Sequence, residues 1–364
     1  MRDLLRYSAR RSLAEALPHD QLRAGPEAPT RDAWAVAVTQ GWTGLLVPEE
    51  YGGSALALAD MVVLSEELGR ALFPGPLVAT AVLGATLATG HAALLTSIAN
   101  GSIRIGVSWP DDLRGGLPVQ PGPVNRNGAL RGSLTLVEYP IDATHILLLD
   151  WDQAILVPAS DLVVTEQQPF DITCPIGSVD CDGVRLGHCP TLTHDAIMIE
   201  RAMAAAAVTI AAELVGVAAA ALEMTISYVG ERRQFGTTIG SFQAVKHRLA
   251  DTYVLIENAR SATAYAAAVE DARGRDRALA LDTAASCAVE AALAATADAV
   301  QLHGAIGYAW DHDAHLYLKR ARRLAANLGQ PEAARARIAA TLMQSLSHGA
   351  EFLFPPIAVL EETR

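Results

Sequence analysis

The sequence lacks the short motifs with which many enzymes hold nucleotides or metals. Its 364 residues contain no GxGxxG, no Walker loop and no HExxH, so a Rossmann dinucleotide site, a P-loop and a zincin centre have no support. Cysteines are few, and their spacing is too wide for a CxxC zinc knuckle; they are Cys174, Cys181, Cys189 and Cys287. We therefore expect no metal site, and thiols that are reduced and buried.

Positive charge is scarce as well. Lys and Arg number 28 against 40 Asp and Glu, which gives a formal net charge of -12. Without basic runs or interleaved aromatic residues, a nucleic-acid or anionic-membrane surface is not expected, and an anionic ligand would need local positive charge. The first residues lead into a charged amphipathic run rather than a signal peptide, which favours a cytoplasmic protein.

One long apolar run is rich in alanine. A hydrophobic content of 51% with 19% charged residues is typical of a soluble globular chain, and 364 residues suffice for two or three domains. The alanine-rich residues 202–221 are interrupted by Glu213 and Gly216, which favours a tightly packed buried helix over a membrane span.

Hydrophobic periodicity divides the chain into three parts. Helical spacing in residues 1–100 predicts a helix ending near Pro18 and further helices at residues 31–40, 58–72 and 79–95. Residues 41–53 contain glycines and a proline that exclude a helix and suggest a buried turn. Residues 101–190 change to short β-type runs, which predict a small β-barrel or sandwich; the runs are 103–109, 134–139, 145–151 and 154–157.

Residues 191–364 return to helical spacing. Four runs predict an up-down four-helix bundle, and a last helix follows at 332–347; the runs are 200–230, 243–272, 276–303 and 317–327. The second helix is predicted to carry one apolar face, made of Phe242, Val245, Leu249, Tyr253 and Ile256. The predicted fold is therefore mainly α with a middle β domain, in the order 1–100, 101–190 and 191–364.

The link between the first two bundle helices carries the most informative residues. Residues 231–243 read ERRQFGTTIGSFQ. Arg232 offers a planar fork of donors that suits pyrophosphate, Gln243 offers directional amide bonds, and Phe235 offers an apolar wall for a flat ring. On this spacing alone, a solvated charge is the favoured interpretation of Arg232. The phosphate-binding interpretation therefore depends on the rest of the chain.

Four segments together resemble the flavin-dependent acyl-CoA dehydrogenases. Residues 41–53 (GWTGLLVPEEYGG) and 66–70 (EELGR) resemble N-terminal signatures of that family. Residues 232–243 resemble its Arg, Phe, Gly and Gln element, and residues 301–308 (QLHGAIGY) resemble its Gln and double-Gly turn. The segments stand in the family's order and cover nearly the whole chain.

The resemblance implies FAD bound between subunits, with residues of this chain at the pyrophosphate and adenosine end of a neighbour's flavin. The cofactor-binding residues that it implies are Arg232, Phe235, Gln243, Gln301 and Gly304. Ala305 replaces the family's second glycine, which restricts close approach of a ligand to the backbone. Helix capping or bundle packing is the alternative interpretation of Gln301 and His303.

The segments that would surround the flavin ring depart from the family. The loop at residues 107–116 retains only a proline with small or acidic neighbours, and the strand at 134–139 lacks the family's Trp. The glutamate that would remove the α-proton of the acyl thioester is also missing, because its two family positions correspond to Leu328 and Ala206.

Two glutamates of the first bundle helix are the remaining candidates for a relocated base. For Glu213, the stronger of the two, a buried carboxylate paired with an arginine is the favoured interpretation. For Glu200 with Arg201, a capping charge at the helix start is favoured. The catalytic residue is therefore left unassigned.

The retained and missing residues resemble actinobacterial subunits that pair with a different acyl-CoA dehydrogenase chain as α2β2 heterotetramers, often acting on CoA thioesters of steroid side chains. This resemblance implies FAD-dependent α,β-dehydrogenation of an acyl-CoA substrate, with a partner subunit or as a homo-oligomer. It also implies an electron-transfer flavoprotein as acceptor. The alternatives are a structural or regulatory subunit without a complete flavin site, and a homomeric enzyme with a relocated base.

Overall fold

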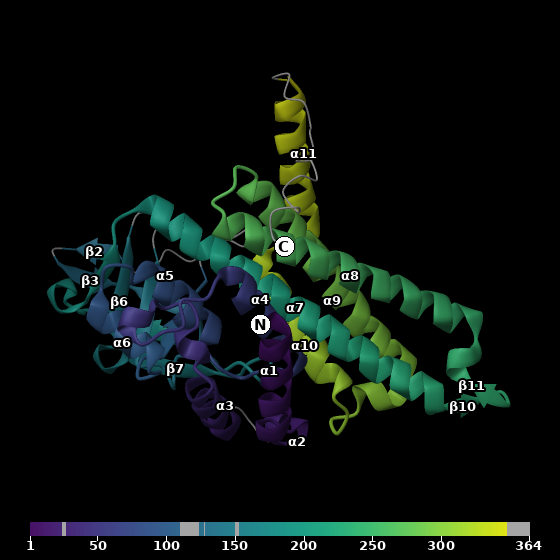
Figure 1. The fold of residues 1–364 in the computed structure, drawn as a ribbon. Coiled ribbons are helices and arrows are strands. Elements are labelled where there is room, and N and C mark those ends of the chain that lie inside the picture. Colours follow the sequence, from purple (N-terminus) through teal and green to yellow (C-terminus); the bar gives the residue numbers. More distant parts are fainter. Residues whose placement is uncertain (24–26, 110–123, 127, 150–152, 348–364) are drawn as a thin grey trace.

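Helices, a sheet and a long helical bundle follow one another along the chain. The computed structural model describes residues 1–23, 27–109, 124–126, 128–149 and 153–347. In Figure 1 the sheet lies at one end of the long bundle helices, with the N-terminal helices beside both. The predicted fold class, mainly α with a middle β part, is confirmed.

The N-terminal part is helical and surrounds one buried turn. Its elements are α1 (Arg2–Ala16), α2 (His19–Arg23), α3 (Glu27–Thr39), α4 (Leu58–Arg70), the π-helix η3 (Val78–Gly84), α5 (Ala85–Leu87) and α6 (Ala92–Ala99). The single helix predicted over residues 79–95 is wrong, because the chain turns at Gly90 with a φ of 91°. Residues 41–53 form the predicted turn, tightened by the 3-10 helices η1 (Trp42–Gly44) and η2 (Glu49–Tyr51).

The middle part is a sheet with strand order β7-β8-β4-β1-β5-β6-β9. Its strands are β1 (Ile105–Val107), β4 (Ser133–Glu138), β5 (His145–Leu149), β6 (Ala154–Pro158), β7 (Val163–Gln167), β8 (Ile176–Asp180) and β9 (Thr191–Thr193). A separate hairpin joins β2 (Val124–Arg126) to β3 (Ala129–Arg131). The predicted runs correspond to β1, β4, β5 and β6, whereas β7, β8 and β9 were not predicted. Residues 110–116 of the loop 107–116 and residues 150–151 of the predicted run 145–151 lie outside the described residues.

The bundle consists of α7 (Ala196–Glu231), α8 (Gln243–Asp271), α9 (Arg277–His303) and α10 (Ala314–Leu328), and α11 (Pro331–Ser347) projects from it (Figure 1). These helices lie within a few residues of the predicted runs. The cap of α7 is Asp195, whose carboxylate accepts a hydrogen bond from the backbone N–H of Ile197 at 2.9 Å. Glu200 is an exposed residue of the second turn, so its prediction as the capping charge is wrong.

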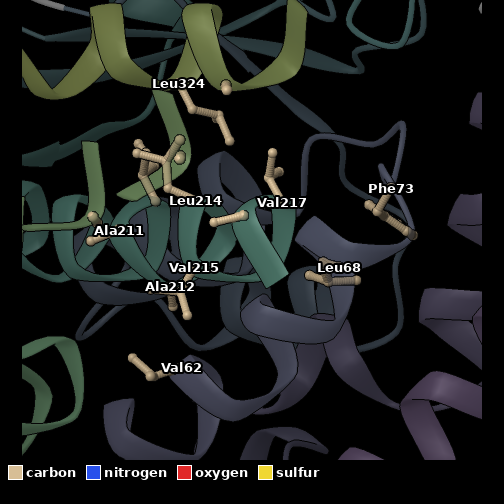
Figure 2. Close-up of a cluster of buried hydrophobic side chains, with 14 of the residues drawn as sticks. Val62, Leu68, Phe73, Ala211, Ala212, Leu214, Val215, Val217 and Leu324 are labelled. Carbon is tan, nitrogen blue, oxygen red and sulfur yellow. The ribbon is translucent and has the colours of Figure 1, made fainter. Parts of the chain in front are cut away.

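Two glycines let α4 and α7 touch along their backbones. A Cβ atom on Gly69 would lie 1.9 Å from the carbonyl oxygen of Glu213, and one on Gly216 would lie 1.9 Å from that of Glu66. The EELGR segment is therefore required for helix packing. Figure 2 shows the apolar side chains around this crossing, with Leu324 of α10 facing Leu214 and Val217 of α7.

Two helical stretches pass a membrane-span test of length and composition. Of the most apolar 18 residues in each stretch, 94% are buried in α7 and 61% are buried in residues 277–308. Core helices of globular proteins pass the same test. The alanine-rich segment is thus the predicted buried helix.

The apolar face predicted for α8 is only partly covered. Ile256 is 1% exposed, but Phe242 is 39% and Tyr253 is 55% exposed. These two aromatic residues of the predicted face stay exposed, because α9, α7 and α4 pack against only part of the circumference of α8.

Replacing Gly216 with Ala should destabilise the fold, because the new methyl group overlaps the backbone of α4. We expect a loss of about 1–3 kcal/mol in the free energy of unfolding, measured by urea denaturation. Gly230→Ala is the matched control, since Gly230 lies in the same helix with open space around it. The control should be neutral or stabilising by up to about 1 kcal/mol. Equal stabilities of the two variants would contradict the backbone contact.

Candidate functional site

The predicted cofactor clamp is a hairpin at the far end of α7. β10 (Arg233–Gln234) pairs with β11 (Thr237–Thr238), and Phe235 and Gly236 form the turn between them. Both turn residues have positive φ, 54° for Phe235 and 81° for Gly236. Asn or Gly normally stands first in such a turn, so an aromatic residue there is strained. The ring of Phe235 is 91% exposed.

The second predicted element ends α9 at the same end of the bundle. Gly304 follows the helix with φ 64° and ψ -138°, a conformation that L side chains rarely adopt. The 3-10 helix η8 (Gly304–Tyr308) continues from it. His303 is 4% exposed and stacks on Tyr228 of α7 with ring centroids 4.3 Å apart. This contact holds the end of α9 beside the end of α7, so the alternative interpretation, bundle packing, describes His303.

The clamp side chains are available to a ligand. Arg232, Phe235, Gln243, Gln301 and Gly304 are all exposed. Within the described parts of the chain, the side chains of Arg232, Gln243 and Gln301 make no ion pair or hydrogen bond. A guanidinium, two amides and an aromatic ring therefore face outward beside glycines with open space above them, which suits a bound pyrophosphate.

The segments that the resemblance assigns to the flavin ring and the base meet at a different place. They line a cavity of about 30 Å³ between η3, β1, β4, α7 and α10. Its walls are Leu68, Phe73, Gly75, Pro76, Leu77, Val78, Ala79, Val107, Trp109, Glu138, Tyr139, Ile210, Glu213, Arg323, Leu324 and Asn327. Leu328 and Ala206 lie next to it along their helices and are 2% and 0% exposed. We call this place the cleft.

A fully buried arginine, Arg320, stands behind the cleft. Its guanidinium donates to Asp171 at 2.9 Å, to Glu213 at 2.6 Å and to the hydroxyl of Thr173 at 2.6 Å. It also donates to the backbone carbonyls of residues 72 and 73 at 3.2 and 3.1 Å. Arg320 is 0% exposed, and these acceptors satisfy its charge, as a buried ion requires.

A second arginine carries the network into the cleft. Arg323 donates to Asp171 at 3.0 Å and to Glu138 at 2.7 Å. Asn327 donates to the same Glu138 oxygen at 3.0 Å. The α10 residues Arg320, Arg323 and Asn327 lie at i, i+3 and i+7, so they occupy one face of that helix. Two guanidiniums thus face three carboxylates.

Burial alone would raise the pKa of Asp171, but the Arg320 and Arg323 guanidiniums outweigh it and lower the pKa to about 2. The pKa of Arg320 is raised, because the carboxylates of Asp171 and Glu213 outweigh the effect of burial. The charges of Asp171 and Arg320 therefore persist at neutral pH.

The structure pairs Glu213 with Arg320, the kind of partner that the sequence interpretation favoured. An acid–base role for Glu213 stays a prediction. Sequence reasoning missed Arg320, Arg323, Asp171 and Glu138 altogether. The sequence did contain one signal for them, because Arg320, Arg323 and Asn327 stand at i, i+3 and i+7 and so share one face of α10. The basic run KRARR around the two arginines is, however, typical of a solvated helix surface.

The clamp and the cleft lie far apart. Glu213 lines the cleft from the middle of α7, and Arg232 follows the last residue of that helix. Nineteen residues at 1.5 Å each separate them by about 28 Å. Figure 1 shows the same separation, with β10 and β11 at the end of the bundle away from the sheet.

Solved structures share this fold along nearly the whole chain. A variant of the Tcur3481–Tcur3483 steroid ACAD is similar with a TM-score of 0.80 at 28% identity, covering 95% of this chain and 98% of that one. Butyryl-CoA dehydrogenase from Megasphaera elsdenii has a TM-score of 0.79 at 17% identity, covering 94% and 98%. The fold is that of the acyl-CoA dehydrogenases.

Sequence comparison gives the same result. The chain matches "Acyl-CoA dehydrogenase, N-terminal domain" over residues 1–94 and "Acyl-CoA dehydrogenase, C-terminal domain" over residues 196–343. It is 34% identical to acyl-CoA dehydrogenase IpdE2 of Mycolicibacterium smegmatis, over 91% of this chain and 95% of that protein. It is also 34% identical to acyl-CoA dehydrogenase FadE34 of Mycobacterium tuberculosis, but spans only 45% of its length. The chain belongs to the acyl-CoA dehydrogenase family, whose members are oxidoreductases acting on acyl-CoA thioesters.

Removing Arg320 should be strongly destabilising, because Asp171 and Glu213 would be left as unpaired buried charges. For Arg320→Met we expect a loss of about 3–5 kcal/mol in the free energy of unfolding. Arg335→Ala, which breaks an ion pair with Glu290 on the surface, should cost at most about 1 kcal/mol. Similar losses in urea denaturation of the two variants would contradict the network.

Asp171 should make stability depend on acid pH. Because its folded pKa is lowered from 3.8 to about 2, its contribution is complete above about pH 4 and is lost as the pH falls toward 2. The stability difference between wild type and Asp171→Asn should therefore shrink by up to about 2 kcal/mol over that window. A stability difference that stays constant over that window would refute the assignment.

Proposed function

We propose that the chain is an acyl-CoA dehydrogenase subunit that contributes its clamp to an FAD whose ring lies in another chain. The observation that carries this proposal is the separation of about 28 Å along α7 between clamp and cleft. A flavin held by the clamp of this chain would have to span about 28 Å to reach the cleft of the same chain. A clamp that serves the cleft of a neighbouring subunit removes this requirement.

The residues at the clamp fit FAD. Arg232 would pair with the pyrophosphate, the amides of Gln243 and Gln301 would orient it, and Phe235 would cover an apolar face. Gly304 would let the backbone approach the ligand closely. When bound, the flavin supplies the hydride acceptor for oxidation of the acyl chain to its α,β-unsaturated form.

The partner that fits best is a different acyl-CoA dehydrogenase chain, in an α2β2 assembly. The similarity to the Tcur3481–Tcur3483 steroid ACAD supports this choice, and so does the lack of a carboxylate at Leu328 and Ala206. A CoA thioester of a steroid is the substrate class that the same similarity suggests. We also propose reoxidation by an electron-transfer flavoprotein, which the family resemblance implies, and a cytoplasmic location.

The test is to co-express the chain with its candidate partner and to measure FAD binding by the purified complex. Arg232→Ala should weaken FAD binding at least about 30-fold, because a buried charge pair is lost. Gln243→Ala should weaken it about 5-fold, the effect of one neutral hydrogen bond. Arg275→Ala is the control, since this exposed arginine follows the opposite end of α8.

Unchanged flavin binding in the two clamp variants would favour a structural or regulatory subunit. Full acyl-CoA-dependent dye reduction by the purified chain alone would favour a homomeric enzyme instead. In that case Glu213→Gln should abolish turnover and leave the flavin bound.

A further inference from the structure

We infer that the last two turns of α9 position the clamp through two buried side chains, His303 toward α7 and Asp298 toward α8. Both are positioning residues, which set the distances among the exposed clamp side chains. The inference rests on the proposed function, and it adds what holds the clamp in a shape that suits one ligand.

The clamp side chains come from the ends of three helices. Arg232 follows α7, Gln243 begins α8, and Gln301 lies in the last turn of α9. Groups on separate elements bind one ligand well only when packing and hydrogen bonds behind them fix their geometry. The joins between these three helix ends therefore decide how well the clamp binds.

The join between α9 and α7 is a ring stack. The rings of His303 and Tyr228 have centroids 4.3 Å apart and planes 25° apart. Tyr228 stands one turn before Arg232, and its carbonyl accepts a hydrogen bond from the Arg232 N–H at 2.8 Å. The carbonyl of Arg232 accepts one from the N–H of Ile239 at 2.8 Å, which closes the hairpin. The stack thus fixes the base of the hairpin relative to α9.

The ring of His303 is held in this stack from two further sides. Its Nδ1–H donates to the carbonyl of Ala299 at 2.6 Å, and the ring of His312 lies 4.4 Å away, centroid to centroid. The Nδ1 of His312 accepts a hydrogen bond from the N–H of Ala314 at 3.1 Å. Burial and the nearby His303 lower the pKa of His312, so this nitrogen is free to accept at neutral pH.

The join between α9 and α8 is an ion pair. The carboxylate of Asp298 accepts hydrogen bonds from the Arg248 guanidinium and, at 2.7 Å, from the hydroxyl of Thr252. Arg248 lies five residues after Gln243 in α8. Because Asp298 and His303 are five residues apart, they point about 140° apart around α9. One side chain therefore reaches each neighbouring helix.

The exposed Gln301 stands between these two buried residues in the sequence. Losing the stack at His303 would let Arg232 shift relative to Gln301. Losing the ion pair at Asp298 would let Gln243 shift in the same way. Each loss should weaken a ligand that is held by all three exposed side chains.

The test measures FAD affinity and thermal unfolding separately on the purified complex. Tyr228→Leu removes the stack but keeps an apolar, helix-forming side chain, whereas Tyr228→Phe keeps the stack. We expect Tyr228→Leu to weaken FAD binding about 5-fold, the effect of one aromatic pair, and Tyr228→Phe to bind like the wild type. Gly216→Ala is the control for lost stability, because it disturbs the contact with α4 in the middle of α7. It should leave FAD affinity unchanged. Equal affinities of the two Tyr228 variants would overturn the inference.

A double-mutant cycle separates positioning from an independent effect on the flavin. If Tyr228 acts by placing Arg232, then Tyr228→Leu should weaken FAD binding less than about 2-fold in a complex that already carries Arg232→Ala. Asp298→Ala is paired with Gln243→Ala in the same way. Undiminished effects in both double variants would overturn the inference. Wild-type FAD binding by the single variants Arg232→Ala and Gln243→Ala would instead refute the proposed function.

Discussion

One buried guanidinium fixes the three parts of this chain relative to one another. Arg320 of the bundle donates to two carbonyls that follow α4, to Asp171 and Thr173 of the sheet part, and to Glu213 of α7. An arginine keeps its proton at all ordinary pH values, so each acceptor must stay in place once the charge is buried. The geometry of the cleft is therefore set by charge as well as by apolar packing.

The length of α7 keeps the clamp and the cleft at separate places along one helix. Its 36 residues extend about 54 Å, from the sheet to the clamp hairpin. Its alanines and Gly216 allow α4 and α9 to pack closely along it, so the helix is a rigid spacer. One end presents exposed donors for a ligand, and the middle lines a filled cleft.

Local patterns in the sequence predicted most of the fold, whereas the clamp residues were predicted only through the resemblance to the acyl-CoA dehydrogenases. Helical spacing placed the bundle helices, but the spacing around Arg232 alone favoured a solvated charge. The ion network could not be predicted in this way, because Arg320 and its carboxylate partners lie 149 and 107 residues apart. A basic run such as KRARR is interpreted as solvated unless its distant partners are known. The strands β7 and β8 were not predicted, because they mix glycine and polar residues with apolar ones. Their alternation of apolar and polar residues is therefore too weak to indicate a strand.

The arginines also account for the missing base. A general base must be able to take up a proton near neutral pH, yet Arg320 and Arg323 lower the pKa of their neighbour Asp171 to about 2. Position 328 carries leucine, and the three carboxylates of the network, Asp171, Glu213 and Glu138, each accept a hydrogen bond from an arginine. The network therefore offers no carboxylate without an arginine partner that could replace the missing glutamate. The exposed clamp lies outside the network, about 28 Å away along α7.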